Sequence, residues 1–223
     1  MKTPAIVINF KAYQESLGTK SLELARMAEK VWKEKGVTIA VAPQLVDLRS
    51  VAESVTIPVF AQSLDITQQG AFTGSTTIQA VKDSGASGFI MNHSERRVRL
   101  SLMSEAVNSA RSLGLTSLIC ADTPDATGAV SSLNPDFVAI EPPELIGTGI
   151  PVSKAKPEVV TDSIDRVRRL GSKSKVICGA GISTADDVRA ALKLGTVGVL
   201  LASGVVKAGD PLVVISDMAD ACL

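Results

Sequence analysis

Aromatic residues and an excess of charge of either sign are what this 223-residue sequence most clearly lacks. Phe, Trp and Tyr make up 3% of it and hydrophobic residues 45%, so the core must be built mainly from aliphatic side chains. This composition is typical of short β-branched strands packed against Ala- and Leu-rich helices. Lys and Arg number 23, as do Asp and Glu. The balance excludes the broad positive field of a general nucleic-acid binder, so we expect no nucleic-acid partner, although a small anion can be held locally.

Cysteine and histidine are also scarce. Cys120, Cys178 and Cys222 are odd in number and widely spaced, which fits neither a disulfide framework nor a CxxC metal site. We therefore expect a reducing, cytoplasmic location. His93 is the single histidine, so a metal site built from several histidines is excluded.

Long apolar runs are missing as well. The apolar run near the N-terminus is ended by Asn9 and Lys11, and it is too short for a signal peptide. No segment offers the roughly 18 uncharged apolar residues that a membrane-spanning helix requires. We expect a soluble protein with no membrane partner.

Short apolar runs recur at intervals of roughly 25–30 residues, and longer stretches with helical periodicity lie between them. This pattern predicts repeated βα units and a parallel sheet. The predicted strands are AIVINF from Ala5, TIAVAP from Thr38, VFAQ from Val59, GFIMN from Gly88, SLICA from Ser117, FVAIE from Phe137, VICGAG from Val176 and GVLLAS from Gly198.

The clearest predicted helices cover residues 21–36 and 183–195, where apolar residues recur at spacings of three and four and the pattern stops at Gly. Ser183 and Ser104 are predicted N-caps. Asp186 and Asp187 fall in the first turn after Ser183, where the helix dipole favours negative charge.

Eight strand–helix pairs without a linker or charge run indicate one domain over residues 1–223, a closed α/β barrel of the (β/α)₈ TIM-barrel type. Periodicity does not report which strands are neighbours. A doubly wound open sheet of similar content therefore remains the alternative.

Functional groups of a barrel lie at the carboxyl ends of its strands, and the first predicted strand ends in two polar residues. Asn9 and Lys11 point to the same side because side chains alternate along a strand. They can reach one ligand together. The alternative for Lys11 is a strand-end lysine that extends into water.

The fourth predicted strand ends at His93, directly before a predicted helix start at Ser94 and Glu95. The positive end of a helix dipole disfavours imidazolium, so the ring should stay neutral and able to donate a hydrogen bond to a carbonyl. That is the role of an electrophile. The alternative is a capping or structural histidine.

The sixth predicted strand ends at Glu141 and continues into PPELIGTGIPVSK, a segment with stiff prolines at one end and glycines within it. A segment of this kind can close over a ligand as a unit and exclude water. The alternative is an ordinary long connection with a solvated glutamate.

The last two predicted strands end in Gly-containing turns, GAGIS over residues 179–183 and LASGVV over 201–206. Their backbone N–H groups can approach a ligand closely. Because barrels often bind phosphate with the loops after strands seven and eight, the two turns together predict a phosphate site. The GAGIST segment lacks the final Gly of a dinucleotide-binding GxGxxG motif.

The motifs NFK, NHSERR, IEPPELIGTG, GAGIS and GVLLASG, in this order over nearly the whole chain, resemble those of the triosephosphate isomerase family in its shorter archaeal form. NHSERR and EPPELIGTG are highly specific as a pair. The resemblance implies an isomerase that interconverts dihydroxyacetone phosphate and D-glyceraldehyde 3-phosphate through an enediolate, in glycolysis and gluconeogenesis. It also implies that no metal or organic cofactor is required.

The resemblance assigns roles to individual residues. Glu141 is implied to be the base that moves a proton between neighbouring carbons, His93 to polarise the substrate oxygens, and Lys11 to supply positive charge. Asn9 is implied to help position the substrate, and Glu95 to support the site. The phosphate group is expected to bind backbone groups of Ile146, Gly181, Ala202 and Ser203.

The sequence departs from the family in residues 61–74, where Ser63 stands at a position at which the resemblance leads us to expect His. This loop is also shorter than in bacterial and eukaryotic members, in which it reaches into a neighbouring subunit. We expect a homo-oligomer, and the short loop leaves dimer and tetramer open.

Two other functions fit a phosphate-binding barrel. In an aldolase, Lys11 would form a Schiff base with a keto substrate. A relative that only binds phosphometabolites, as a sensor or scaffold, should have lost the base or the electrophile, whereas Glu141, His93 and Lys11 are all present.

Overall fold

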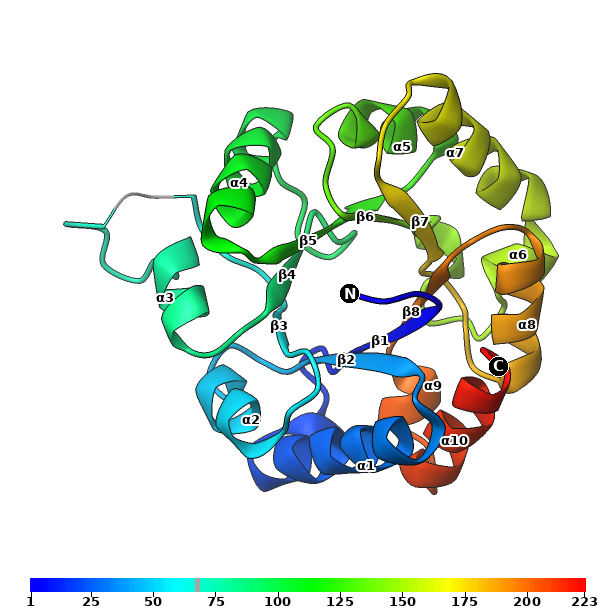
Figure 1. The fold of residues 1–223 in the computed structure, drawn as a ribbon, viewed down its shortest axis with the longest axis horizontal. Helices are drawn as coiled ribbons and strands as arrows, with labels where there is room; N and C mark the ends of the chain where they lie inside the picture. The colour runs from blue at the N-terminus through cyan, green and yellow to red at the C-terminus, as the bar shows by residue number, and fades with distance from the viewer. Residues whose placement is uncertain (67–68) are drawn as a thin grey trace.

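The computed structural model describes residues 1–66 and 69–223, and its eight strands are all parallel. The strands form the centre of the molecule and the helices surround them (Figure 1). The strands are β1 (Ala5–Asn9), β2 (Thr38–Ala42), β3 (Phe60–Ala61), β4 (Gly88–Met91), β5 (Thr116–Ala121), β6 (Phe137–Ile140), β7 (Lys175–Cys178) and β8 (Gly198–Leu201).

The strands close into a barrel. Hydrogen-bonded neighbours follow the order β2-β1-β8-β7-β6-β5-β4-β3, which leaves only β2 and β3 to be joined. A parallel bridge between Val41 and Val59 joins them, and the N–H of Val41 donates to the carbonyl of Pro58 at 3.0 Å. The (β/α)₈ prediction is therefore confirmed, and the alternative of an open doubly wound sheet is wrong.

Alternation along the strands separates two apolar layers. One buried cluster lies inside the barrel and includes Val7, Leu118, Ala139 and Leu200, whereas alternate residues such as Ile6 pack in the layer between strands and helices. Strands of parallel sheets are buried on both faces in this way, which explains their continuous apolar sequences.

The helices of the described residues lie around the barrel (Figure 1). They are α1 (Thr19–Lys35), α2 (Leu48–Ser54), α3 (Ile78–Asp83), α4 (Leu100–Leu113), α5 (Pro124–Ser131), α6 (Val152–Ala155), α7 (Pro157–Arg169), α8 (Ala185–Lys193), α9 (Ser203–Val206) and α10 (Pro211–Asp220), with the 3₁₀ turns η1 (Gln14–Ser16) and η2 (Pro143–Leu145). None of these helices is long and apolar enough to cross a membrane.

Both predicted N-caps are wrong. The N-cap of α8 is Thr184 and not Ser183, because Thr184 accepts the N–H of Asp187 and the Asp187 carboxylate accepts the N–H of Thr184 in a reciprocal capping box. Helix α4 begins at Leu100, so Ser104 lies inside it. The predicted acidic first turn of α8 is confirmed.

The loop that departs from the family pattern follows β3. Ser63 accepts a hydrogen bond from the Arg96 guanidinium at 3.1 Å, and the same guanidinium lies 3.1 Å from Asp65. The loop after β3 is therefore attached to the segment after β4. Thr67 and Gln68 of this loop lie outside the described residues.

Candidate active site

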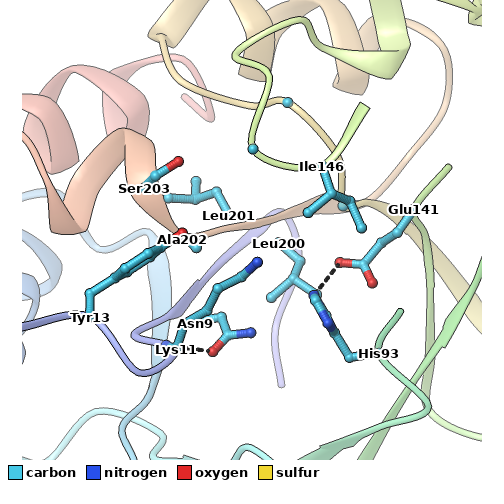
Figure 2. A pocket seen from close by; sticks show the side chains of 13 residues that line it. Asn9, Lys11, Tyr13, His93, Glu141, Ile146, Leu200, Leu201, Ala202 and Ser203 are labelled. Carbon is cyan, nitrogen blue, oxygen red and sulfur yellow. Dashed lines mark hydrogen bonds and ion pairs between the residues drawn. The ribbon is translucent and has the colours of Figure 1, made fainter. Parts of the chain in front are cut away.

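A pocket lies at the carboxyl ends of the strands, and Figure 2 shows its side chains converging from β1, β4, β6 and β8. Most of the predicted site residues line it, and Glu95 lies beside it. The lining residues are Asn9, Lys11, Tyr13, His93, Glu141, Ile146, Gly147, Gly179, Gly181, Leu200, Leu201, Ala202 and Ser203.

The end of β1 carries Lys11 in a left-handed backbone conformation with φ of 48°. The Asn9 side chain accepts the N–H of Lys11 at 3.0 Å, and the Gln62 side chain donates to the carbonyl of Lys11 at 3.0 Å. These two bonds hold a conformation that is uncommon for a non-glycine residue. The Lys11 ammonium lies 2.8 Å from Glu95, and its side chain is 12% exposed, so it lies in the pocket rather than in open water.

His93 reaches the pocket because the strand alternation ends before it. Asn92 has a left-handed φ of 61°, and its side-chain amide donates to the Cys120 carbonyl on β5 at 2.8 Å. This turn fixes the chain direction at the end of β4. The predicted helix start at Ser94 and Glu95 is wrong, because these residues form a turn and α4 begins only at Leu100.

The imidazole of His93 is buried and neutral. Burial, and next the Lys11 charge, lower its pKa to about 4, so the cause is not the helix end that the sequence suggested. The N–H of Glu95 donates to Nδ1 at 3.2 Å, so a neutral ring carries its proton on Nε2. This Nε2 lies 3.7 Å from Oε1 of Glu141.

Glu141 is a carboxyl group in an almost dry position, 2% exposed. Burial raises its pKa to about 7, against lowering contributions from the Cys120 thiol and Lys11. Its backbone N–H donates to the Ala121 carbonyl at 2.7 Å, while Oε2 is buried without a hydrogen-bond partner among the described residues. A carboxylate in this state is a stronger base than one in water.

Gly179 makes the space in which Glu141 lies. A Cβ atom at this glycine would be 2.4 Å from Cγ and 2.8 Å from Oε1 of Glu141. The prediction for the GAGIS segment concerned backbone approach to a ligand, but its first glycine also accommodates the neighbouring carboxylate. The contact depends on the pairing of β6 with β7, which the sequence does not reveal.

The segment after Glu141 is attached to the barrel at its far end. Gly147 and Gly149 have φ of 74° and 72°, and a Cβ atom at Gly181 would be 1.9 Å from the Ile150 carbonyl oxygen. The N–H of Val152 donates to the Ala180 carbonyl at 3.2 Å. The second glycine of GAGIS therefore allows this segment to pass directly over the loop after β7.

Two ion pairs fix the ends of the same segment. Glu144 near its start pairs with Lys156, two residues beyond its end, and Lys154 at its end lies 2.6 Å from Asp187 of the α8 capping box. The middle of the segment, which contains Ile146 and Gly147, lines the pocket between these attachments.

The two Gly-containing turns meet at one side of the pocket. A Cβ atom at Gly204 would lie 2.8 Å from Cα of Ser183, so the turns after β7 and β8 are in direct contact. Ser203 and Gly204 are the first residues of α9, and N–H groups at the start of a helix have no carbonyl partner within it. Such groups suit an anion.

Sequence reasoning missed Tyr13, Gln62 and Cys120. Tyr13 is two residues beyond Lys11, so continued alternation was a signal for it, and Gln62 directly follows β3. Cys120 lies inside the barrel and pairs with Ala139 of the neighbouring strand β6. Ala139 is two residues before Glu141. Its position depends on strand pairing, for which the sequence carries no local signal.

These features define a class of protein, a (β/α)₈ barrel whose mouth places a raised-pKa carboxylate, a neutral imidazole and an ammonium beside two Gly-containing turns. Groups of this kind move protons on a small anionic substrate.

The sequence model of the triosephosphate isomerase family matches residues 4–219, and the chain belongs to this family. It is 53% identical over 203 residues to a triosephosphate isomerase of Methanocaldococcus jannaschii, covering 91% of this chain and 93% of the relative. It is 48% identical over 218 residues to that of Methanosarcina acetivorans, covering 98% of each chain, and 48% identical to that of Methanobacterium bryantii, covering 97% and 96%.

Proposed function

We propose that this protein interconverts dihydroxyacetone phosphate and D-glyceraldehyde 3-phosphate through an enediolate, in glycolysis and gluconeogenesis. The family membership supports this activity. The observation that carries it is the buried Glu141 carboxylate, with a pKa of about 7, placed 3.7 Å from Nε2 of a neutral His93. A base and a neutral hydrogen-bond donor at this separation can contact neighbouring atoms of one substrate, the base a carbon-bound proton and the donor the oxygen beside it.

Glu141 is the proposed base. It removes a proton from the carbon beside the substrate carbonyl and returns it to the neighbouring carbon, so the reaction shifts protons without a net redox partner. A dry carboxylate with a raised pKa suits this step at neutral pH.

His93 and Lys11 are the proposed stabilisers of the enediolate. The Nε2–H of His93 donates to the substrate oxygens, as the acceptor role of Nδ1 requires. Lys11 supplies positive charge, and Glu95 holds its ammonium at 2.8 Å. Asn9 lines the pocket and is proposed to help position the substrate, and its side chain also holds the Lys11 backbone. Fixed donors and charges in a water-poor site stabilise a developing oxyanion more than mobile water does.

The segment over the pocket is the proposed lid, and the turns beside it the proposed phosphate site. Closure would exclude water and retain the enediolate, which would otherwise lose phosphate. The proposed phosphate ligands are backbone groups of Ile146, Gly181, Ala202 and Ser203, all of which line the pocket. The proposed reaction requires neither a metal ion nor an organic cofactor.

We also propose that residues 1–223 form one domain that acts in the cytoplasm as a homo-oligomer, either dimer or tetramer. Exposed apolar side chains in the loops after the first strands support the assembly. Leu17, Val46 and Phe72 are 50%, 80% and 50% exposed in the single chain. A partner subunit that covers these loops would remove the three side chains from water.

The deciding experiment is an isomerase assay on glyceraldehyde 3-phosphate with a metal chelator present, with Glu141→Ala measured beside the wild type. We expect fast turnover of the wild type and a loss of about 10²–10⁴-fold or more in the variant, because a positioned general base is removed. Wild-type turnover in Glu141→Ala would refute the assignment of the base. An inactive wild type that still binds phosphate would refute the isomerase activity.

Borohydride trapping with a keto substrate separates this proposal from an aldolase. A Schiff-base lysine must present a neutral amine, whereas the Lys11 ammonium is paired with Glu95 at 2.8 Å. We expect no covalent adduct on Lys11. A substrate-dependent adduct there would favour the aldolase.

A further inference from the structure

We propose that Tyr13, supported by Lys207, binds the phosphate end of the substrate and sets the preference for a phosphorylated triose. The inference rests on the function proposed above and adds a side-chain ligand to a site otherwise built from backbone groups. Three observations carry it: the place of Tyr13 in the pocket, its fixed backbone, and the cation over its ring.

Tyr13 lies on the phosphate side of the pocket. It lines the pocket together with Ala202 and Ser203. Figure 2 shows its side chain extending from the loop after β1 toward Ala202, on the opposite side of the pocket from His93 and Glu141. The hydroxyl end of the ring therefore faces the turn after β8, and the ring is remote from the groups that transfer protons.

The backbone of Tyr13 is held in place by Ser16. Its carbonyl accepts the N–H and the hydroxyl of Ser16, both at 3.1 Å. The hydroxyl of Ser16 also donates to the Phe10 carbonyl at 2.8 Å, and Ser16 is fully buried. The loop after β1 thus presents Tyr13 from a rigid base, as a ligand-binding side chain requires.

Lys207 places a positive charge over the ring of Tyr13, with its ammonium nitrogen 4.3 Å from the ring centroid. It directly follows α9, and its N–H donates to the Ser203 carbonyl at 3.1 Å. Lys207 forms none of the ion pairs found within residues 1–66 and 69–223. Its charge is therefore not offset by a carboxylate there.

A cation over an aromatic ring is attracted to its π electrons and fixes the ring orientation. It also draws electron density away from the phenol, which makes the hydroxyl a better donor to an anion. Lys11, the lysine that lines this pocket, is already paired with Glu95. Lys207 and the Tyr13 hydroxyl together supply the additional positive character that a phosphate dianion requires at this side of the site.

The inference predicts a change in substrate binding rather than in proton transfer. Tyr13→Phe removes the donor and keeps the ring, so the KM for glyceraldehyde 3-phosphate should rise about tenfold, the usual effect of losing one hydrogen bond to a charged group. Lys207→Met should raise it about threefold, with a weaker effect at high salt. Their effects should be less than multiplicative in the double variant, because Lys207 acts partly through the ring.

Inorganic phosphate is the direct probe. We expect its dissociation constant, measured by calorimetry, to rise in Tyr13→Phe and Lys207→Met in the same proportion as KM. Lys30→Met, which removes an exposed lysine of α1, is the matched control and should change neither quantity. Melting curves of all variants confirm that they are folded.

Unchanged KM and unchanged phosphate affinity in Tyr13→Phe would overturn the inference. So would a loss confined to kcat, or a shifted pH profile at constant KM, because either result would place Tyr13 in proton transfer. The phosphate titration also separates the two proposals. If the wild type binds phosphate without isomerising triose phosphates, the proposed function fails, while weaker phosphate binding by Tyr13→Phe still supports the role of Tyr13.

Discussion

Replacing Glu141 by Gln is expected to stabilise the fold at alkaline pH while it abolishes the proposed reaction. Burial raises the pKa of this carboxyl from its ordinary value of 4.5 to about 7. At about 1.4 kcal/mol for each pH unit between these values, ionising Glu141 in the folded state costs about 3 kcal/mol more than in the unfolded chain. Glutamine has nearly the same shape and carries no charge.

The sign of this effect depends on pH. Because the folded state binds the Glu141 proton more tightly than the unfolded state, the contribution of Glu141 to the free energy of unfolding falls as the pH rises from 4.5 to 7 and is constant above. The gain from Glu141→Gln should therefore be less than about 1 kcal/mol at pH 5 and about 3 kcal/mol at pH 8.

Urea unfolding at pH 5 and pH 8 measures the two gains. All samples should be compared at one protein concentration, because the stability of an oligomer depends on it. Trp32, the single tryptophan, provides a fluorescence signal beside circular dichroism. Glu23→Gln, which removes an exposed carboxylate of α1, is the control and should show no comparable dependence on pH. Equal gains at both pH values, or a net loss at pH 8, would refute the assignment of a buried charge to Glu141.

Three further predictions concern catalysis. The kcat/KM should fall tenfold per pH unit as the pH drops below about 7, because Glu141 must be ionised. His93 stays neutral over this range because its pKa is about 4. A flat profile between pH 5 and 8 would contradict this prediction. Gly179→Ala should lower kcat about 10²-fold, since its Cβ would lie 2.4 Å from Cγ of Glu141, and wild-type kcat in a folded variant would show that the carboxylate position is unimportant. Gly147→Pro should slow turnover at least about tenfold, because proline cannot adopt the φ of 74°. Steady-state kinetics would detect an unchanged rate, which would argue for a static segment.

The apolar runs of the sequence predicted the strands well, because burial on both faces leaves a continuous apolar signature. Seven of the predicted runs overlap strands of four or more residues, and the run from Val59 contributes the two-residue strand β3 and the closing bridge. Closure itself depends on the contact between Val41 and Val59 and is not local. For this reason the sequence predicts a closed barrel but does not exclude an open sheet.

The errors at the helix ends also have physical causes. Ser183 and Thr184 are adjacent and both can cap a helix, but only Thr184 places Asp187 at the third helical position for reciprocal bonding. Ser94 and Glu95 resemble a helix cap directly after His93, whereas the segment turns once and reaches α4 only at Leu100. The sequence argument predicts a neutral His93 ring from a helix dipole. The ring is neutral for a different reason, because burial and Lys11 lower its pKa.

The contact between Gly179 and Glu141 has a consequence for how this site can vary. The backbone of one strand end and the side chain of its neighbour occupy adjoining space, with no room for a methyl group between them. A larger residue at position 179 becomes acceptable only if position 141 changes as well, to a shorter or reoriented side chain. The two positions therefore behave as one unit under substitution, and libraries designed to alter the specificity of this barrel should vary them jointly or leave both fixed.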